Sequence, residues 1–263
     1  MLTSSRARPE RPIDLLSDYD VIVFVAEAEA FAADLEWQSV WRQPLARWGD
    51  EGSRYGLPVY FRGVVYDDWL KIDWSIWPEE LLQRIAEEPL HDQLDVGYRV
   101  LLDKTGVTAR WAEPTYRAHI PAPPTQVEYD ALVDEFWWSS SYVAKGLWRG
   151  EVVNAKLALD VDMKLGVLRR FLEWQIELAN EWAVKPGAYG RGLERLLDPE
   201  TAEELAATYV GSGIEENWEA LFATTALFRR VATDVADALD LRYPEELDDI
   251  ATGYLEAVRD LNR

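Results

Sequence analysis

A change of hydrophobic pattern near the middle of the chain constrains the possible folds most. The segment Ile120-Pro-Ala-Pro-Pro124 suits neither the interior of a helix nor a central strand, because proline lacks a backbone N–H donor. Short β-rich runs precede this segment: Val21–Val25, Val59–Phe61 and Trp69–Trp77. After it, apolar residues recur at spacings of three and four. The pattern predicts an α/β or α+β domain over residues 1–120 and a helical domain over 121–263.

The second half carries clear signals for the ends of helices. Thr125-Gln-Val-Glu128 forms a capping box, in which the Thr and Glu side chains satisfy free backbone N–H groups at a helix start. Further helices are expected over Glu151–Trp182 as one or two pieces, Pro199–Tyr209, Ile214–Leu239 and Pro244–Leu261. No internal repeat or heptad run is visible, so the pattern favours a helical bundle over a solenoid or coiled coil.

Composition excludes several classes of site. The chain of 263 residues has no Cys and only 2 His, which removes thiolate nucleophiles, zinc–cysteine sites and sites built from several histidines. Carboxylates must therefore carry any metal chemistry. No stretch approaches the roughly 18 apolar residues of a membrane span, and no signal-peptide core follows the N-terminus. We therefore expect a cytoplasmic protein without a membrane partner.

The net charge separates two classes of ligand. The formal charge is −21, from 27 Lys and Arg against 48 Asp and Glu, and such a field repels nucleic acid and attracts cations. No nucleic-acid partner is expected. An alternative explanation is that the acidic surface simply keeps the protein soluble.

Asp18-Tyr-Asp20 directly precedes the most apolar run of the chain. Residues two apart on a strand point to the same face, so both carboxylates could bind one Mg²⁺ ion, which prefers oxygen ligands. Asp73 lies on the polar side of Leu70–Ile76, and could approach the pair if the two strands are neighbours. Two alternatives stay open: the aspartates could be solvated surface groups, or a glycosyltransferase could use such a pair to hold a nucleotide sugar.

Several segments together resemble one enzyme family over nearly the whole chain. They are Asp18-Tyr-Asp-Val-Ile-Val-Phe-Val25, Lys71-Ile-Asp-Trp74, Leu101-Leu-Asp-Lys104, Glu135-Phe-Trp137, Ser141-Tyr-Val-Ala-Lys-Gly-Leu147, Asn217-Trp-Glu-Ala-Leu-Phe222 and Ala226-Leu-Phe-Arg229. In order and spacing they resemble the aminoglycoside 6-adenylyltransferases, also called streptomycin adenylyltransferases. The resemblance implies an α+β fold: a polymerase-β-like nucleotidyltransferase domain with a mixed sheet, followed by an all-α helical bundle domain.

The resemblance also implies a reaction and its catalytic residues. AMP would pass from Mg²⁺-bound ATP to a hydroxyl of a cationic, streptomycin-type aminoglycoside, with release of pyrophosphate. Asp18 and Asp20 would hold Mg²⁺ on the triphosphate, while Asp73 would bind metal and deprotonate the acceptor hydroxyl. An alternative is a nucleotidyltransferase that acts on another acceptor.

Further residues are expected to bind the substrates. The resemblance makes Tyr142 and Lys145, which share a helix face, nucleotide ligands, together with Ser5 and Arg6. Local chemistry alone favours the alternative that Lys145 is an exposed lysine that covers a neighbouring tryptophan. Glu135 lies on the same stripe and is a candidate for the acceptor side, or a surface ion-pair partner.

The chain departs from the family pattern at its N-terminus. The family has a Gly-Ser turn before the aspartate pair, where this chain has Ser4-Ser5, and glycine suits close approach of backbone to phosphate. The family also places a helix and a strand before this turn, which begins here almost at Met1. We therefore expect either a start codon placed too far downstream or a shortened, catalytically silent nucleotide-binding relative.

Overall fold

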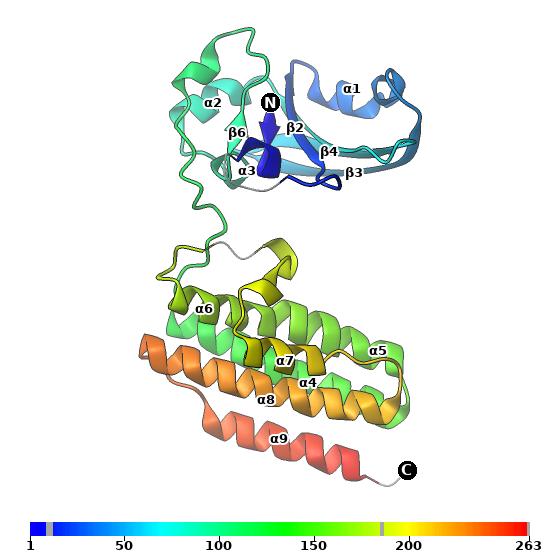
Figure 1. The fold of residues 1–263 in the computed structure, drawn as a ribbon, viewed down its shortest axis with the longest axis vertical. Helices are drawn as coiled ribbons and strands as arrows, with labels where there is room; N and C mark the ends of the chain where they lie inside the picture. The colour runs from blue at the N-terminus through cyan, green and yellow to red at the C-terminus, as the bar shows by residue number, and fades with distance from the viewer. Residues whose placement is uncertain (9–12, 185–186, 262–263) are drawn as a thin grey trace. The chain divides into compact units, whose positions relative to one another are not determined.

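The computed structural model describes residues 1–8, 13–184 and 187–261. The chain divides into two compact units, Met1–His119 and Ile120–Arg263, and the proline-rich segment opens the second (Figure 1). The first unit is built on a sheet with short helices, and the second is built of helices. The fold is therefore α+β with a helical C-terminal region, as the sequence predicted.

Within the described residues, the first unit contains a six-stranded mixed sheet of order β3-β4-β5-β2-β1-β6. Its strands are β1 (Leu2–Thr3), β2 (Tyr19–Val25), β3 (Pro44–Arg54), β4 (Leu57–Tyr66), β5 (Lys71–Pro78) and β6 (Tyr98–Arg99). The central strands β2 and β5 run parallel, and the other described pairs are antiparallel. The centre of the sheet thus joins two segments that are distant in sequence.

Short helices cover both faces of this sheet. On one face, Ile22 and Trp77 pack with Leu81 and Ile85 of α2 (Leu81–Glu87). On the other, residues of α1 (Ala28–Ala33) pack against β4 and β5. Strands buried on both faces read as continuous apolar runs, which explains the Val21–Val25 segment. A further short helix, α3 (Asp92–Asp95), follows α2.

Three of the described strands, β1, β3 and the two-residue β6, were not predicted from the sequence. The hairpin strand β3 is polar and almost wholly exposed, because it lies at a sheet edge and hydrogen-bonds only to β4. The two-residue β1 pairs with Val21 of β2, although we expected no strand beside that run. The Met1 ammonium extends this contact by donating to the carbonyl of Ile22 at 2.8 Å. Such short or polar strands carry little periodicity from which to predict them.

The described α-helices of the second unit are α4 (Gln126–Arg149), α5 (Val152–Lys156), α6 (Arg169–Ala179), α7 (Pro199–Ala207), α8 (Ile214–Leu239) and α9 (Glu245–Asp260). The capping box at Thr125 and Glu128 is present, with hydrogen bonds in both directions. A π-helical segment, η4 (Leu157–Leu168), joins α5 to α6, so the expected helical region contains a change of helix type. Among the described helices, none is long and apolar enough to cross a membrane.

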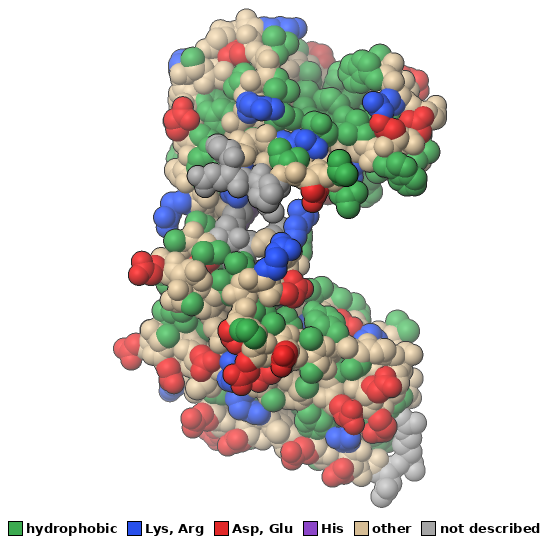
Figure 2. Space-filling model, in the orientation of Figure 1, with side chains coloured by type: hydrophobic (Ala, Val, Ile, Leu, Met, Phe, Trp, Pro, Cys, Tyr) green, Lys and Arg blue, Asp and Glu red, His purple; other side chains and the backbone are tan. Residues whose placement is uncertain are grey.

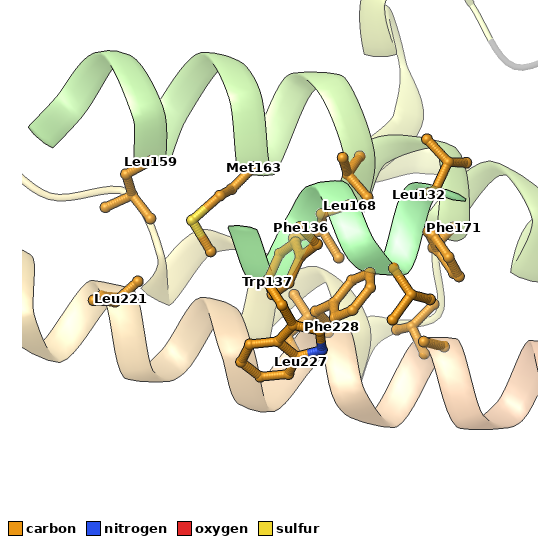
Figure 3. Packing of buried hydrophobic residues seen from close by; sticks show 14 of the residues in the cluster. Leu132, Phe136, Trp137, Leu159, Met163, Leu168, Phe171, Leu221, Leu227 and Phe228 are labelled. Carbon is orange, nitrogen blue, oxygen red and sulfur yellow. The ribbon is translucent and has the colours of Figure 1, made fainter. Parts of the chain in front are cut away.

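Aromatic side chains from three helices form the centre of the helical unit (Figure 3). The rings of Phe136 on α4 and Phe228 on α8 stack with their centroids 3.6 Å apart. Phe171 on α6 meets Phe228 edge-on at 4.9 Å. This packing sets the rotation of α4 about its own axis, so that Phe136 faces the core while Tyr142, about a third of a turn around the helix, is exposed.

Candidate active site

The predicted carboxylates meet on one face of the sheet in the first unit. The parallel register of β2 and β5 pairs Asp20 directly with Asp73. Asp18 immediately precedes β2 and Lys71 is the first residue of β5, each two residues before the paired aspartate on its strand. Because side chains two residues apart share a face, the four charged groups form a compact set across the two strand starts.

The same face becomes apolar farther along both strands. Ile22 and Trp77 are almost fully buried beneath α2. Between the charged and apolar parts, the Ser75 hydroxyl accepts a hydrogen bond of 2.8 Å from the Gln93 side chain. One strand pair therefore combines an anchored core with a charged end that solvent reaches.

The Lys71 ammonium bridges two of the three aspartates. Its Nζ lies 2.8 Å from Oδ2 of Asp18 and 2.8 Å from Oδ2 of Asp73. The side chains are 40% exposed for Lys71, 39% for Asp18 and 17% for Asp73, so Asp73 is the most enclosed partner. Although burial lowers the pKa of Lys71, its hydrogen bonds to Asp18 and Asp73 raise it above the usual lysine value.

Asp20 lies close to two other carboxylates, those of Asp18 and Asp73. Burial raises the pKa of Asp20, and the charges of Asp73 and Asp18 raise it further, while a hydrogen bond from Ser4 acts in the opposite direction. A carboxylate that is partly removed from water beside two others favours a cation nearby. The three aspartates are thus electrostatically coupled.

A tight turn after β1 supports Asp20 and the start of β2. Ser4 opens the turn η1 (Ser4–Ala7) with φ of 59°, in the left-handed region that favours glycine. The Arg6 guanidinium donates to the carbonyls of Asp18 (Nε, 2.9 Å) and Ser17 (Nη2, 2.7 Å) and lies over the Tyr19 ring at 3.7 Å. Arg6 therefore holds the segment that carries Asp18, and Ser5 lies half-buried beside it.

Gly63 on β4 makes room for the carboxylate of Asp73. The two residues are paired across β4 and β5. A Cβ atom at Gly63 would lie 3.1 Å from Oδ1 of Asp73 and 3.2 Å from Cε1 of Phe61, closer than ordinary van der Waals contact. The absence of a side chain at this position therefore sets where Asp73 can lie.

The donor set fits a divalent cation such as Mg²⁺. Across the described residues, no three His, Asp or Glu side chains are gathered as a finished coordination site. Asp18, Asp20 and Asp73 nonetheless supply hard oxygen ligands on one face, and their coupled charges would be relieved by a cation. The arrangement is a cluster of three carboxylates, two of which form ion pairs with Lys71.

The remaining predicted residues lie on α4, in the helical unit. Lys145 Nζ lies 4.4 Å from the centroid of the Tyr142 ring, and that ring meets Trp138 edge-on at 4.8 Å. Trp138 and Tyr142 are exposed, at 64% and 41%. Glu135 is exposed one turn earlier. The helix thus presents a cation, two aromatic rings and a carboxylate along one stripe.

Three residues of the charged face were not predicted as site residues: Lys71, Ser4 and Gly63. A signal existed for Lys71, because it alternates with Asp73 on the polar side of a strand. Ser4 was noted only as a departure from the family pattern. Gly63 carried no signal, since its importance depends on the neighbouring strand.

Comparison with known proteins finds similarity along the whole chain. The family model described as streptomycin adenylyltransferase matches residues 1–258. The chain is 30% identical over 261 residues to the aminoglycoside 6-adenylyltransferase of Bacillus subtilis, covering 98% of this chain and 89% of that protein. The corresponding protein of Campylobacter jejuni is 29% identical over 247 residues, covering 92% and 83%. A crystal structure of an aminoglycoside 6-adenyltransferase from Bacillus subtilis matches with a TM-score of 0.52 and 26% identity, covering 93% of this chain and 89% of that one.

Proposed function

Because the chain belongs to the streptomycin adenylyltransferase family, a family of nucleotidyltransferase enzymes, we propose that it transfers AMP from Mg²⁺-bound ATP to a hydroxyl of a streptomycin-type aminoglycoside. A bond forms between the acceptor oxygen and the α-phosphorus, and the bond from that phosphorus to the leaving pyrophosphate breaks. The hydroxyl proton passes to a carboxylate of the protein. The observation that carries this proposal is the pairing of Asp20 with Asp73, with Asp18 beside them.

Asp18, Asp20 and Asp73 are the proposed ligands of the divalent cation. When bound, Mg²⁺ would supply positive charge to the attacking and leaving oxygens of an in-line displacement. The protein's own contribution is preorganisation: the β2–β5 ladder fixes the relative height of Asp20 and Asp73, and Arg6 fixes the backbone at Asp18. Such prior positioning lowers the barrier because less reorganisation is needed during the reaction.

Asp73 is the proposed general base. A sugar hydroxyl is a poor nucleophile at neutral pH, so a positioned carboxylate that accepts its proton accelerates the attack by about 10²–10⁴-fold. Asp73 suits this role because it is the most enclosed partner of Lys71 and because Gly63 leaves room beside its Oδ1 atom. Its backbone is held on both sides by neighbouring strands.

We assign the nucleotide-binding role to Ser5 and Arg6 in the first unit and to Tyr142 and Lys145 on α4. Arg6 and Lys145 would supply positive charge to the phosphates, as guanidinium and ammonium groups commonly do. In this assignment residues 1–120 form the nucleotidyltransferase domain and residues 121–263 the helical domain. The turn at Ser4–Ala7 holds the Arg6 guanidinium at the backbone carbonyls of Ser17 and Asp18, next to the start of β2, which supports this assignment for the first pair.

The acceptor is proposed to be cationic because of the charge of the protein. The net charge of −21 attracts polycations, and Figure 2 shows acidic side chains across the visible face of the helical unit. Glu135, exposed on α4, is the proposed contact to the amino or guanidino groups of the acceptor. Charge complementarity of this kind aids both encounter and orientation.

The test is pyrophosphate release from ATP and Mg²⁺ with a panel of aminoglycosides that includes streptomycin. We expect release with a streptomycin-type acceptor, and a loss of about 10²–10⁴-fold in kcat for Asp73→Asn. Asp67→Asn is the matched control, since Asp67 is an exposed aspartate of the same unit. Absence of release with every acceptor contradicts the proposed reaction. Turnover of Asp73→Asn at the rate of Asp67→Asn contradicts the assignment of the base.

A further inference from the structure

Lys71, whose ammonium joins Asp18 to Asp73, belongs to the same pair of strands as the aspartates. Lys71 begins β5, two residues before Asp73, and its ammonium contacts one oxygen of Asp73 and one of Asp18 at 2.8 Å each. Arg6, the other cation beside the start of β2, donates to backbone carbonyls of Ser17 and Asp18. Among the described residues, Lys71 is thus the cation that contacts the carboxylate oxygens of Asp18 and Asp73.

We propose that Lys71 is an internal counter-ion that organises the aspartates in the metal-free protein and competes with the divalent cation for Asp18 and Asp73. Lys71 is then a positioning residue whose ion pairs must open when the cation binds. This inference rests on the proposed function in one respect: that these aspartates bind a divalent cation.

The charges on this face supply the first argument. Three carboxylates on adjacent strand starts repel one another, because Asp20 is paired with Asp73 and Asp18 lies two residues before Asp20. An ammonium placed between Asp18 and Asp73 offsets this repulsion, so the carboxylates stay together before a metal arrives. Removing Lys71 should therefore destabilise the metal-free unit.

The second argument concerns the shared oxygen atoms. Lys71 occupies Oδ2 of both Asp18 and Asp73. A divalent cation that takes either oxygen meets a like charge at short range, so the ammonium must move away. The lysine stem is flexible and its side chain is 40% exposed, which gives the ammonium a route to solvent. Competition of this kind weakens cation binding in the parent protein.

A purely structural ion pair makes a different prediction. If Lys71 only contributes to folding, its removal lowers the unfolding temperature and leaves the affinity for a divalent cation unchanged or weaker. If it competes, the same substitution lowers the unfolding temperature and raises that affinity. Both hypotheses predict a lower unfolding temperature, but only competition predicts tighter binding of the divalent cation. The cation affinity of a single variant therefore distinguishes them.

The experiment is a Mn²⁺ titration of the metal-free full-length protein, followed by the electron paramagnetic resonance signal of free Mn²⁺. Lys71→Met is expected to lower the Mn²⁺ Kd by roughly three- to tenfold, the range accounted for by two half-exposed ion pairs. Lys104→Met is the matched control, because Lys104 is an exposed lysine of the same unit and its loss changes the net charge equally. Lys71→Arg keeps the charge and should not bind Mn²⁺ more tightly than the parent.

Thermal unfolding supplies a second readout that is independent of turnover. Without metal, Lys71→Met should melt a few degrees below Lys104→Met, and Mn²⁺ should raise its melting temperature more than it raises that of the parent. Lys71→Gln serves the same comparison if Lys71→Met folds poorly. Equal Mn²⁺ affinity in Lys71→Met and Lys104→Met overturns the inference.

The titration also separates this inference from the proposed function. If the parent binds no Mn²⁺, or Asp20→Asn binds it as tightly as the parent, the proposed metal site is wrong and the role of Lys71 falls with it. If Asp20→Asn abolishes binding while Lys71→Met binds no more tightly than the control, only the role of Lys71 is wrong.

Discussion

Gly63→Ala is the substitution that tests most directly how the sheet positions Asp73. Gly63 is paired with Asp73 across β4 and β5, and an added Cβ would lie 3.1 Å from Asp73 Oδ1 and 3.2 Å from Phe61 Cε1. The new methyl group must displace the carboxylate, the ring or the strand. The substitution therefore perturbs the proposed base without removing any of its atoms.

Two opposing effects determine how much Gly63→Ala changes the free energy of unfolding. A Gly→Ala change at a permitted backbone conformation stabilises a protein by about 0.4–1 kcal/mol, because the unfolded chain loses freedom. Overpacking costs about 1–3 kcal/mol. Gly52→Ala on the same hairpin isolates the first effect, since its added Cβ would lie 3.8 Å or more from its neighbours. The two variants should thus differ in stability by about 1–3 kcal/mol.

Calorimetry and steady-state kinetics of the two variants provide the assay. For a unit of this size, the midpoint of Gly63→Ala should lie roughly 4–12 °C below that of Gly52→Ala. A shift of the Asp73 carboxylate by a few tenths of an ångström should reduce kcat by about tenfold, since larger misplacements cost about a hundredfold. Gly52→Ala should keep the parental kcat.

One result would contradict the packing argument, and another would contradict the role of Asp73 as the base. Equal midpoints for both variants would show that the space beside Asp73 is larger than the distances indicate. A lower midpoint for Gly63→Ala with parental kcat would uphold the packing argument and contradict the role of Asp73 as the base.

Three further outcomes follow from the charged groups. Asp20→Asn should raise the melting temperature of the metal-free protein at neutral pH, because burial, then neighbouring charges, raise the pKa of Asp20 in the folded state. The destabilisation by Asp20 is absent below its unfolded pKa of about 3.9 and grows as pH rises to the folded pKa. The melting temperatures of variant and parent should therefore converge in acid. Arg229→Met should cost about 3 kcal/mol in denaturant unfolding, because it leaves the Asp248 side chain, 4% exposed, without its cation. Burial alone raises the pKa of Asp248, but hydrogen bonds from Arg229 and Tyr243 lower it below its usual value. The stabilisation by the charged Asp248 is present above about pH 3.9 and is lost as pH falls through the folded pKa. The loss of stability caused by Arg229→Met should therefore shrink in acid. Lys145→Met should raise the KM for ATP by about tenfold, the loss of roughly one charge-assisted contact, while Arg149→Met, one turn later on α4, should not.

The helical unit was the more predictable part of the fold. The capping box marked the start of α4 at Gln126, and helical periodicity gave the bounds of α8, Ile214–Leu239, which the structure confirms. These signals are local, because a helix satisfies its hydrogen bonds within a few residues. The π-helical segment Leu157–Leu168 was not predicted, since its pattern also fits an ordinary helix.

The candidate site was predictable in its residue types. The chain has no Cys and two His, so metal chemistry was confined to carboxylates. Asp18 and Asp20 stood directly before an apolar run, and Asp73 stood on the polar side of another run. Their separate roles came from the family resemblance and stay predictions. The sequence also contained Lys71 on the polar side of the same run as Asp73, without indicating that it would contact Asp18, more than fifty residues earlier in the chain.

By itself, the sequence determined which residues could do chemistry, where most helices and central strands lie, and the family to which the chain belongs. Only the tertiary structure decided that β2 and β5 are parallel neighbours, that Asp20 stands beside Asp73, and that Lys71 joins Asp18 to Asp73. The physical reason is that periodicity reports the faces of a single element. Strand order and register arise instead from hydrogen bonds and packing between segments far apart in the chain, which no local pattern encodes.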